Sequence, residues 1–295
     1  MKRAQFPALL LALLATSRAL ADSTVDPANA VAWGGNVGGL NWRPSTADGV
    51  LTGEYVCSGM VWAANAGWIN MGSGAPANGI RYQNTDGADC GVNLLADGSL
   101  RGLAWGANIG WVNFEPLGDP RVDYATGKLT GYAWGANVGW IHLGDVTFGV
   151  ATQSIAPGAD SDNDGIADAW ELQRAGNLLA LGGNIGGGGG DYDGDGISDA
   201  QEYRADTDPL NPNDRFRITN LALDFDPVVE FSLTWTSSTA RSYVIESRES
   251  LSTGQWADAG LGTLGGAGGL QTRTFGGPAS ATRFFRVRAC LPLQP

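Results

Sequence analysis

Four short segments that place tryptophan around an asparagine–glycine turn restrict the possible folds of this chain more than any other feature. Three of them share the pattern Trp-x-Ala-Asn-x-Gly-Trp and the first is degenerate; they span residues 33–42, 62–68, 105–111 and 134–140. Apolar and polar residues alternate around each turn, which is typical of two strands joined in a hairpin. One hairpin cannot bury two large rings alone, so we expect one antiparallel hairpin-repeat β domain over residues 22–150.

The residue types suggest a role for each position of the repeat. Large aromatic side chains dominate burial, so we expect the tryptophans to form the core, with an exposed platform for sugars or another ligand as the alternative. The asparagine is expected to close its own turn on local backbone amides, and the glycine to supply a positive φ. The segment from about residue 30 to 145 resembles tryptophan-repeat regions of exported bacterial proteins that have no assigned activity.

Two twelve-residue loops, residues 160–171 and 191–202, carry the densest charge. Each has acidic residues at loop positions 1, 3, 5, 9 and 12 and glycine at position 6, and neither contains Lys or Arg. Ca²⁺ takes six to eight oxygen ligands, which can include the carbonyl of position 7 and, directly or through water, position 9. The predicted calcium ligands are Asp160, Asp162, Asp164, Ile166, Asp168 and Glu171 in the first loop, and Asp191, Asp193, Asp195, Ile197, Asp199 and Glu202 in the second.

The residues around the loops distinguish them from a helix–loop–helix calcium site. Pro157 and Gly158 break any helix before the first loop, whereas a short helix can follow it over residues 169–174. The layout of residues 160–214 resembles thrombospondin type-3 calcium repeats of bacterial surface proteins, including the Thr-Asp-Pro tail at residues 207–209. It departs from them in a glycine-rich insertion, residues 182–190, which we interpret as a flexible linker.

Two acidic residues after the second loop leave two interpretations open. Asp206 and Asp208 are either further calcium ligands or turn residues, because aspartate serves both purposes. We assign residues 151–215 to one calcium-binding segment with short helices.

The C-terminal part, residues 216–295, returns to short alternating strands separated by turns, which favours a small β-sandwich. The stretch from Ser242 to Val287 resembles fibronectin type III-like modules of exported proteins. The chain as a whole is therefore expected to be mainly β.

The N-terminus indicates export. A positive start, a short apolar run and a small-residue cleavage site predict a signal peptide over residues 1–21, and no later run is long enough to span a membrane. Export makes a disulfide between Cys57 and Cys90 plausible and leaves Cys290 over. The 30 acidic residues outnumber the 18 basic ones, which argues against a nucleic-acid partner.

The single histidine limits the chemistry. His142 is the only one in the chain, so neither a histidine metal cluster nor a recognisable Ser–His–Asp arrangement is available, and we expect no enzyme activity. His142 follows Trp140 by two residues, which puts both on one face of a strand. The pair resembles the copper site of methanotroph surface proteins, where an oxidised tryptophan and two histidines bind copper; here the second histidine is absent.

These features favour a non-catalytic secreted or cell-surface protein in which calcium orders the segment between two β domains. The alternatives are a surface copper-binding protein that uses Trp140 and His142, and a carbohydrate-binding module that uses exposed tryptophans. Other cell-surface proteins or glycans are the expected further partners.

Overall fold

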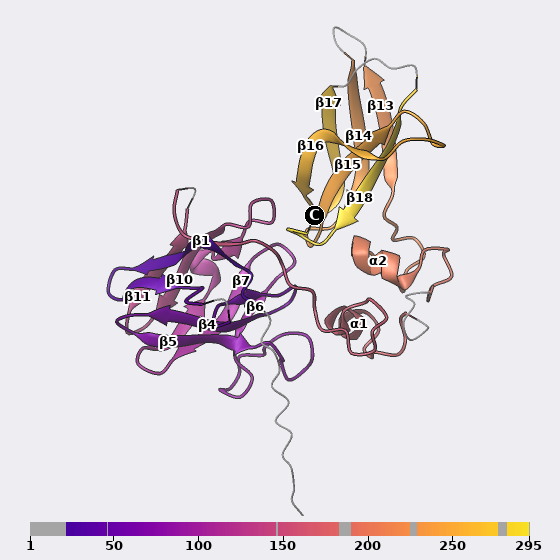
Figure 1. The fold of residues 1–295 in the computed structure, drawn as a ribbon. Coiled ribbons are helices and arrows are strands. Elements are labelled where there is room, and N and C mark those ends of the chain that lie inside the picture. Colours follow the sequence, from indigo (N-terminus) through magenta and orange to yellow (C-terminus); the bar gives the residue numbers. More distant parts are fainter. Residues whose placement is uncertain are drawn as a thin grey trace, which may run out of the picture.

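The computed structural model describes residues 22–45, 47–145, 147–182, 190–224, 229–276 and 282–294. In these residues the chain is mainly β, with a barrel, a segment with two short helices and a pair of packed sheets following one another along the sequence (Figure 1). The predicted signal peptide, residues 1–21, and residues 183–189 of the predicted linker lie outside the described residues.

Eight antiparallel strands of the N-terminal part close into a barrel. Their order is β11-β1-β2-β4-β5-β7-β8-β10, and β10 pairs with β11 to complete the ring. The four predicted hairpins are its consecutive strand pairs, so they form a closed barrel and not a simple row of hairpins, and closure leaves no open edge among these strands. The strands are β1 (Val25–Gly34), β2 (Gly38–Asn41), β4 (Cys57–Ala63), β5 (Gly67–Ser73), β7 (Leu100–Gly106), β8 (Gly110–Phe114), β10 (Leu129–Gly135) and β11 (Gly139–Gly144).

Shorter elements extend this ring. One 3₁₀ turn, η1 (Pro116–Gly118), follows β8, and four short strands pair with barrel strands: β3 (Leu51–Thr52), β6 (Val92–Leu94), β9 (Arg121–Val122) and β12 (Val150–Thr152).

The prediction that the repeat tryptophans form the core is wrong. An eight-stranded barrel has an interior that side chains of modest size fill, and here small and aliphatic residues face inward: Ala32, Val61, Ala63, Ile69, Ala104, Val112, Ala133 and Ile141. Because side chains alternate along a strand, the tryptophans between them face outward and remain 39–55% exposed.

Trp42 is the exception, with 3% exposure. It is not the counterpart of the second tryptophan in the other repeats, because Gly39 is the residue that pairs with Trp33 across the first hairpin. Trp42 lies beyond the end of β2, and its ring packs edge-on against Phe114 in the core.

The asparagine of each repeat connects two neighbouring hairpins, which corrects the prediction that it closes its own turn. Each turn is closed by a backbone bond, such as Ala66 N to Ala63 O. Each asparagine instead donates its side-chain N–H to a backbone carbonyl in the turn of the neighbouring hairpin. The four bonds run around the whole barrel end: Asn65 to Val37 (3.3 Å), Asn108 to Ala66 (3.2 Å), Asn137 to Ile109 (3.0 Å) and Asn36 to Val138 (3.2 Å).

The cysteines correct a second prediction, because Cys57 and Cys90 are free thiols and form no disulfide. The Cys57 side chain is enclosed in the barrel core, where burial raises the pKa of its thiol to about 12. Cys90 lies in the loop between β5 and β6, and its thiol donates to the carbonyl of Gly87. Cys290 is also a free thiol and donates to the carbonyl of Ser242.

The C-terminal part consists of two antiparallel three-stranded sheets, ordered β13-β14-β17 and β16-β15-β18. Leu233, Trp235, Tyr243, Ile245 and Phe275 form the core of this sandwich. The strands are β13 (Ile218–Asp224), β14 (Glu230–Ser237), β15 (Ser242–Arg248), β16 (Ala257–Gly265), β17 (Gly269–Gly276) and β18 (Phe284–Cys290).

Candidate calcium sites

Each acidic loop folds around a cluster of three aspartates. The carboxylates of Asp160, Asp162 and Asp164 offer oxygens within 4.8 Å of one another, and those of Asp191, Asp193 and Asp195 do the same. Within the described residues, these are the groups of three or more acidic, histidine or cysteine side chains that could hold a metal ion.

The backbone of both loops takes the same path. The position-6 glycines, Gly165 and Gly196, have φ of +91° and +90°, a region that favours glycine. Position 4 is also left-handed, at Asn163 (+61°) and Gly194 (+76°). Asparagine and glycine tolerate this conformation, so their presence at position 4 is a signal in the sequence that the predicted ligand pattern did not include.

Backbone N–H groups hold the aspartates in place by hydrogen bonds to some of their carboxylate oxygens. At position 1, Asp160 accepts from the backbone N–H of Asp164 and Gly165, at 3.2 and 3.0 Å. At position 5, Oδ1 of Asp164 accepts from Ile166 (2.8 Å), and the second loop repeats this bond at Asp195. These bonds use only Oδ1 of position 5 and leave Oδ2 outside the backbone hydrogen bonds of the loop.

Several loop oxygens are buried without a hydrogen-bond partner. A buried carboxylate oxygen is costly unless it is paired, so these atoms are suited to coordinate a cation. They belong to loop positions 3, 5 and 12, the positions that supply ligands in a calcium loop, and their oxygen-only chemistry fits Ca²⁺. These atoms are Oδ1 of Asp162, Oδ2 of Asp164, both oxygens of Glu171, Oδ2 of Asp193 and Oε2 of Glu202.

The position-12 glutamates carry the electrostatic cost of these clusters. Burial, followed by repulsion from Asp164 and other loop carboxylates, raises the pKa of Glu171 to about 8. Burial and the carboxylates led by Asp193 raise that of Glu202 to about 7. A divalent cation at each site would remove this repulsion, because it favours the ionised form of every neighbouring carboxyl.

One base reaches the second loop, although the loop itself contains none. Arg215 Nε lies 2.7 Å from Oδ2 of Asp195 and also donates to the carbonyl of Pro212 at 2.8 Å. The two loops therefore differ in their surroundings, since no ion pair is found to an aspartate of the first loop among the described residues.

The position-9 aspartates are turned toward the protein and lie outside the two clusters. Asp168 accepts from the backbone N–H and the hydroxyl of Ser161, at 2.7 and 2.5 Å. Asp199 accepts from the N–H groups of Tyr192 and Gly182, both at 2.9 Å. Each is the first residue of a helix, α1 (Asp168–Arg174) or α2 (Asp199–Ala205), where a negative charge is favourable.

The two loops share one small core although a glycine-rich insertion separates them in sequence. Ile166, Ala167, Trp170, Leu181 and Tyr203 pack together from both repeats. The ends of the insertion also meet, because Gly190 N donates to Gly182 O at 3.2 Å. A Cβ at Gly182 would overlap Oδ2 of Asp164, so only glycine allows this approach. The insertion therefore does not separate the repeats.

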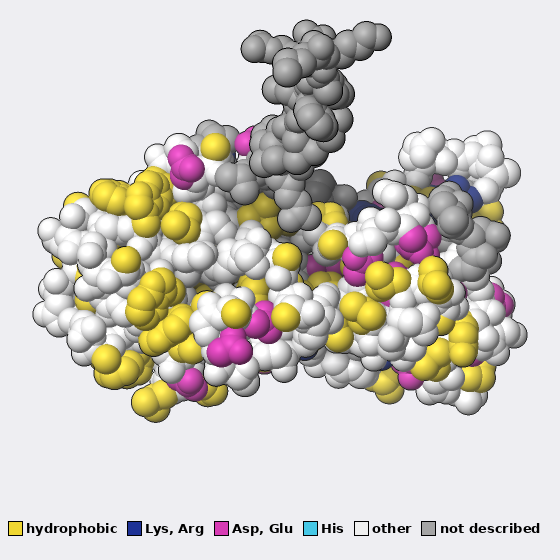
Figure 2. All heavy atoms as spheres, turned by 90° about the horizontal axis from the view of Figure 1, so that it is seen from below, with side chains coloured by type: hydrophobic (Ala, Val, Ile, Leu, Met, Phe, Trp, Pro, Cys, Tyr) yellow, Lys and Arg dark blue, Asp and Glu magenta, His cyan; other side chains and the backbone are white. Residues whose placement is uncertain are grey.

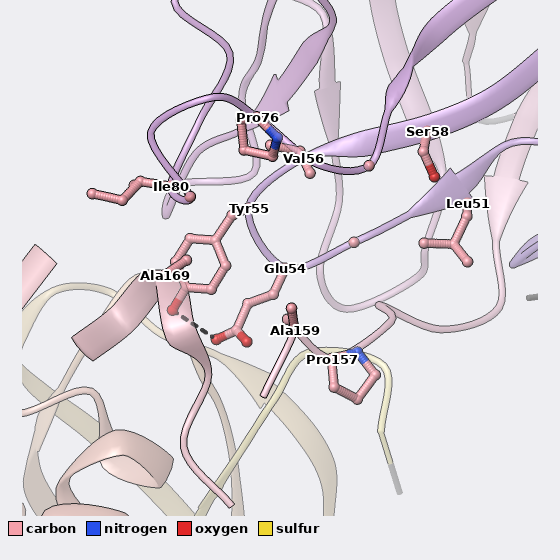
Figure 3. A pocket seen from close by; sticks show the side chains of 14 residues that line it. Leu51, Glu54, Tyr55, Val56, Ser58, Pro76, Ile80, Pro157, Ala159 and Ala169 are labelled. Atoms are coloured by element: carbon pink, nitrogen blue, oxygen red, sulfur yellow. Dashed lines mark hydrogen bonds between the residues drawn. The ribbon is translucent and has the colours of Figure 1, made fainter. Parts of the chain in front are cut away.

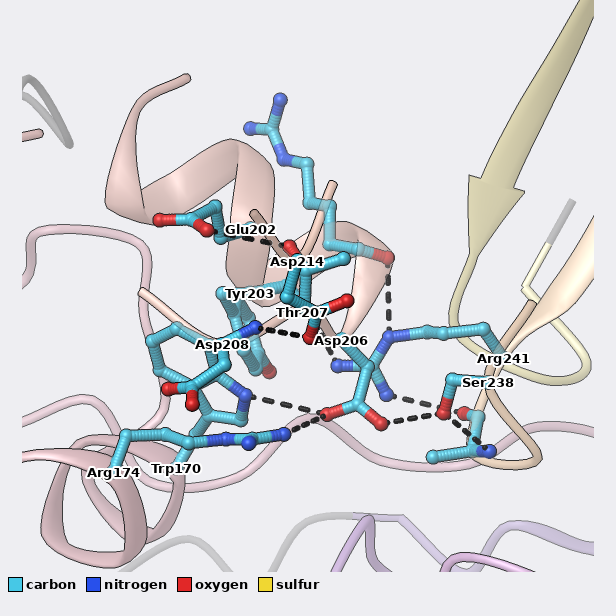
Figure 4. Close-up of polar contacts among 12 residues, drawn as sticks. Trp170, Arg174, Glu202, Tyr203, Asp206, Thr207, Asp208, Asp214, Ser238 and Arg241 are labelled. Atoms are coloured by element: carbon cyan, nitrogen blue, oxygen red, sulfur yellow. Dashed lines mark hydrogen bonds and ion pairs between the residues drawn. The ribbon is translucent and has the colours of Figure 1, made fainter. Parts of the chain in front are cut away.

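Asp206 and Asp208 serve as turn and contact residues in the structure. Asp206 ends α2 with φ of +58°, and its carboxylate accepts from Trp170 Nε1 (3.3 Å), Arg174 (3.2 Å) and the Ser238 hydroxyl (2.5 Å). Figure 4 shows this carboxylate between the helix of Trp170 and Arg174 and the loop of Ser238. Asp208 accepts from Leu210 N at 3.3 Å, as in a turn.

A second polar cluster joins the barrel, α2 and the sandwich. Glu54, in the loop before β4, points away from the barrel toward the calcium segment, as Figure 3 shows together with the neighbouring Tyr55, Ala159 and Ala169. Its carboxylate accepts from the Tyr203 hydroxyl of α2 at 2.6 Å and pairs with Arg241 of the sandwich at 3.2 Å. Arg241 also donates to the carbonyls of Tyr203 (2.6 Å) and Arg204 (3.1 Å).

The proposed copper pair lies on the outer face of β11, but His142 is surrounded by rings. It stacks on Tyr132 at 4.7 Å and meets Phe148 edge-on at 5.4 Å. No group of three possible metal ligands among the described residues includes it. His142 lies two residues after the second tryptophan of its repeat. The equivalent residues of the other repeats, counted from Gly39 in the first, are asparagines: Asn41, Asn70 and Asn113. The structure thus gives the copper hypothesis no support.

Comparison with known families agrees with the loop geometry. Residues 160–176 and 191–212 match the family model of the bacterial TSP3 repeat, so the predicted thrombospondin type-3 repeats are confirmed. No curated protein and no solved structure matches the chain. Among the described residues, no helix is long and apolar enough to cross a membrane.

Proposed function

We propose that this chain is a non-catalytic calcium-binding protein of the cell exterior, in which two calcium ions fix the orientation of the barrel and the sandwich. Ca²⁺ would be held by the aspartates of positions 1, 3 and 5, the carbonyl of position 7 and the glutamate of position 12. The buried, unpartnered oxygens at positions 3, 5 and 12 of the first loop, and at positions 3 and 12 of the second, support this ligand set. Position 9 has a structural role, because neither Asp168 nor Asp199 belongs to a three-aspartate cluster and neither has a buried oxygen without a partner.

The observation that carries the orienting role is the contact of Tyr203 with Glu54. Tyr203 directly follows Glu202, the last acidic residue of the second loop, and it reaches a barrel residue with its hydroxyl. Its backbone carbonyl accepts from Arg241 of the sandwich. Calcium that draws Glu202 into the loop therefore positions the residue that touches both β units, and its binding free energy becomes ordering free energy.

Small-angle X-ray scattering of the full chain tests the proposal, with saturating Ca²⁺ in one sample and chelator in the other. We expect a compact particle with calcium and a larger radius of gyration without it. Hydrogen exchange over residues 160–214 should accelerate in chelator. The double variant Glu171→Gln/Glu202→Gln should behave in calcium as the native chain does in chelator, and Asp208→Asn should not. Identical scattering and exchange in both samples would exclude a calcium-dependent orientation.

A further inference from the structure

Seven outward-facing tryptophans surround the barrel near one end. At that end Asn36, Asn65, Asn108 and Asn137 link the turns of neighbouring hairpins, and we call these four residues the asparagine ring. We call Trp33, Trp62, Trp68, Trp105, Trp111, Trp134 and Trp140 the tryptophan collar; each is between 39% and 55% exposed. Figure 2 shows hydrophobic side chains gathered in patches over the barrel surface. Contiguous apolar patches on the surface of a protein often mark a site of contact with another molecule.

Polar side chains alternate with the rings in a regular register. Asn41 pairs with Trp62, Asn70 with Trp105 and Asn113 with Trp134, on the side of each ring away from its own hairpin. His142 occupies the equivalent place beside Trp33. Each hairpin therefore offers aromatic surface next to a group that donates and accepts hydrogen bonds.

Hairpin stability explains only part of the collar. Opposed rings across a hairpin stabilise it, and Trp62–Trp68 and Trp105–Trp111 are such pairs, with ring centroids 4.8 and 4.5 Å apart. Trp33 has no such partner, because Gly39 lies opposite it. Nevertheless it is the most exposed of the seven, at 55%. Trp33 therefore presents ring surface that no ring across the hairpin covers.

Charge restricts the class of that ligand. None of the 30 acidic or 18 basic residues of the chain lies in the collar segments, residues 31–42, 60–71, 103–114 and 132–143. An anionic lipid surface or an acidic partner would require Lys or Arg at the contact. The complementary partner is therefore uncharged.

Shape restricts it further. A stable contact with a second copy or another globular protein needs about 800 Å² on each side. Because the collar is convex, one globular partner can touch only a few of its tryptophans at a time. A thin chain can instead follow the curve from ring to ring. The hairpins repeat every two strands, about 10 Å, which is comparable to the length of a disaccharide unit.

We propose that the tryptophan collar binds an uncharged polysaccharide. The apolar C–H faces of its sugar rings pack on the electron-rich indole faces, while its hydroxyl groups hydrogen-bond to the neighbouring amides of Asn70 and Asn113. Trp33, beside Gly39, provides an open ring face for one sugar unit. This binding uses only barrel residues, so it does not depend on calcium.

Affinity electrophoresis and pull-down of the full chain test the proposal, with cellulose, chitin, xylan and mixed-linkage β-glucan as probes. At least one neutral polysaccharide should retain the protein, equally in calcium and in chelator and in high salt. Trp33→Ala and Trp105→Ala should each weaken binding about tenfold or more, and Trp33→Phe should restore most of it. Leu179→Ala is the matched control, because this residue is 88% exposed and lies outside the barrel, in the segment of the acidic loops.

Several results would overturn this assignment. No retention on any of the four probes, or retention that the tryptophan variants leave unchanged, excludes a polysaccharide site on the collar. Binding to phosphatidylcholine vesicles, or concentration-dependent dimerisation in sedimentation, that the same variants abolish would identify a membrane or a second copy as the occupant. If calcium did not make the chain more compact but the polysaccharide still bound, only the calcium proposal would be contradicted.

Discussion

The hydroxyl of Tyr203 donates a 2.6 Å hydrogen bond to Oε2 of Glu54, which precedes it by 149 residues. Burial, together with the charge of Glu54 and this bond, raises the pKa of Tyr203, so the hydroxyl keeps its proton. The other oxygen of Glu54 pairs with Arg241, whose side chain is 2% exposed against 7% for Glu54. A charge pair removed from water is tolerated only when further hydrogen bonds satisfy it, and here the calcium segment provides them.

The buried pair should be sensitive to the loss of one partner. Arg241→Leu leaves the Glu54 carboxylate buried without a counter-charge, and we expect a loss of about 3 kcal/mol in the free energy of unfolding. Denaturant unfolding in saturating calcium measures this. Replacing Glu54 by glutamine removes the unpaired charge, so the double variant Glu54→Gln/Arg241→Leu should recover part of the loss. If the double variant lost as much stability as the two single variants added together, the two charges would not interact.

Each position-12 glutamate should control one calcium ion. Calorimetric titration of the native chain should give two ions, and Glu171→Gln or Glu202→Gln should each give one. Chelation should lower the melting temperature, since each site adds about 2.7 kcal/mol of stability when free calcium is 100 times its dissociation constant. If either variant still bound two ions with native affinity, that glutamate would not be a ligand.

Asp206 should matter for stability and not for calcium stoichiometry. Asp206→Asn keeps a residue that tolerates the left-handed backbone but loses the charge that Trp170, Arg174 and Ser238 contact. Charged hydrogen bonds contribute roughly 2 kcal/mol, and we expect a loss of that size in denaturant unfolding. Asp208→Asn is the matched control and should remain near native. A drop from two bound ions to one in Asp206→Asn would instead identify Asp206 as a ligand.

The asparagine ring should contribute to barrel stability at each hairpin alike. Asn65→Ala removes one inter-hairpin bond, and we expect a cost of about 1 kcal/mol. Asn36→Ala should cost a similar amount, because Asn36 closes the ring between the first and last hairpins. Ala64→Ser changes an exposed neighbour in the same turn and should leave the melting curve unchanged. Equal stability of Asn65→Ala and the native chain would mean that water replaces the bond without loss.

Cys57 should be inert to thiol reagents in the native barrel. Its pKa of about 12 leaves little thiolate at pH 8, and the thiolate is the reactive form. Mass spectrometry after iodoacetamide treatment should show Cys90 modified on the order of 100 times faster. Since the pKa is raised on folding, this thiol stabilises the fold below pH 9 and loses that effect as the pH rises toward 12. A Cys57–Cys90 cross-linked peptide in non-reduced digests would contradict the structure.

The repeat pattern allowed the four hairpins to be predicted, but not the direction of their side chains. Period-two alternation identifies two faces without saying which one is buried. Closure of eight strands decides it, because the inward-facing strand positions hold residues such as Ala63 and Ile69, and the tryptophans that alternate with them face outward. The partner of each asparagine was equally hidden, since Asn36 and Val138 are adjacent only in the closed ring.

The two acidic loops were predictable in detail because their carboxylates lie close together in sequence. Spacing alone placed Asp160, Asp162 and Asp164 in one cluster. What spacing could not show is competition for the same carboxylates: Asp199 accepts from the backbone N–H of Gly182, which precedes it by 17 residues. The roles of Asp206 and Arg215 likewise depend on tertiary contacts.

The meeting of Gly182 and Gly190 has a practical consequence for the chain. Because these residues are hydrogen-bonded to each other, the sequence between them begins and ends at the same place on the molecule. Its length can therefore change without altering the distance between the two calcium sites. Evolution could lengthen it, or an experimenter could insert a fluorescent or affinity module there, while the sites keep their spacing.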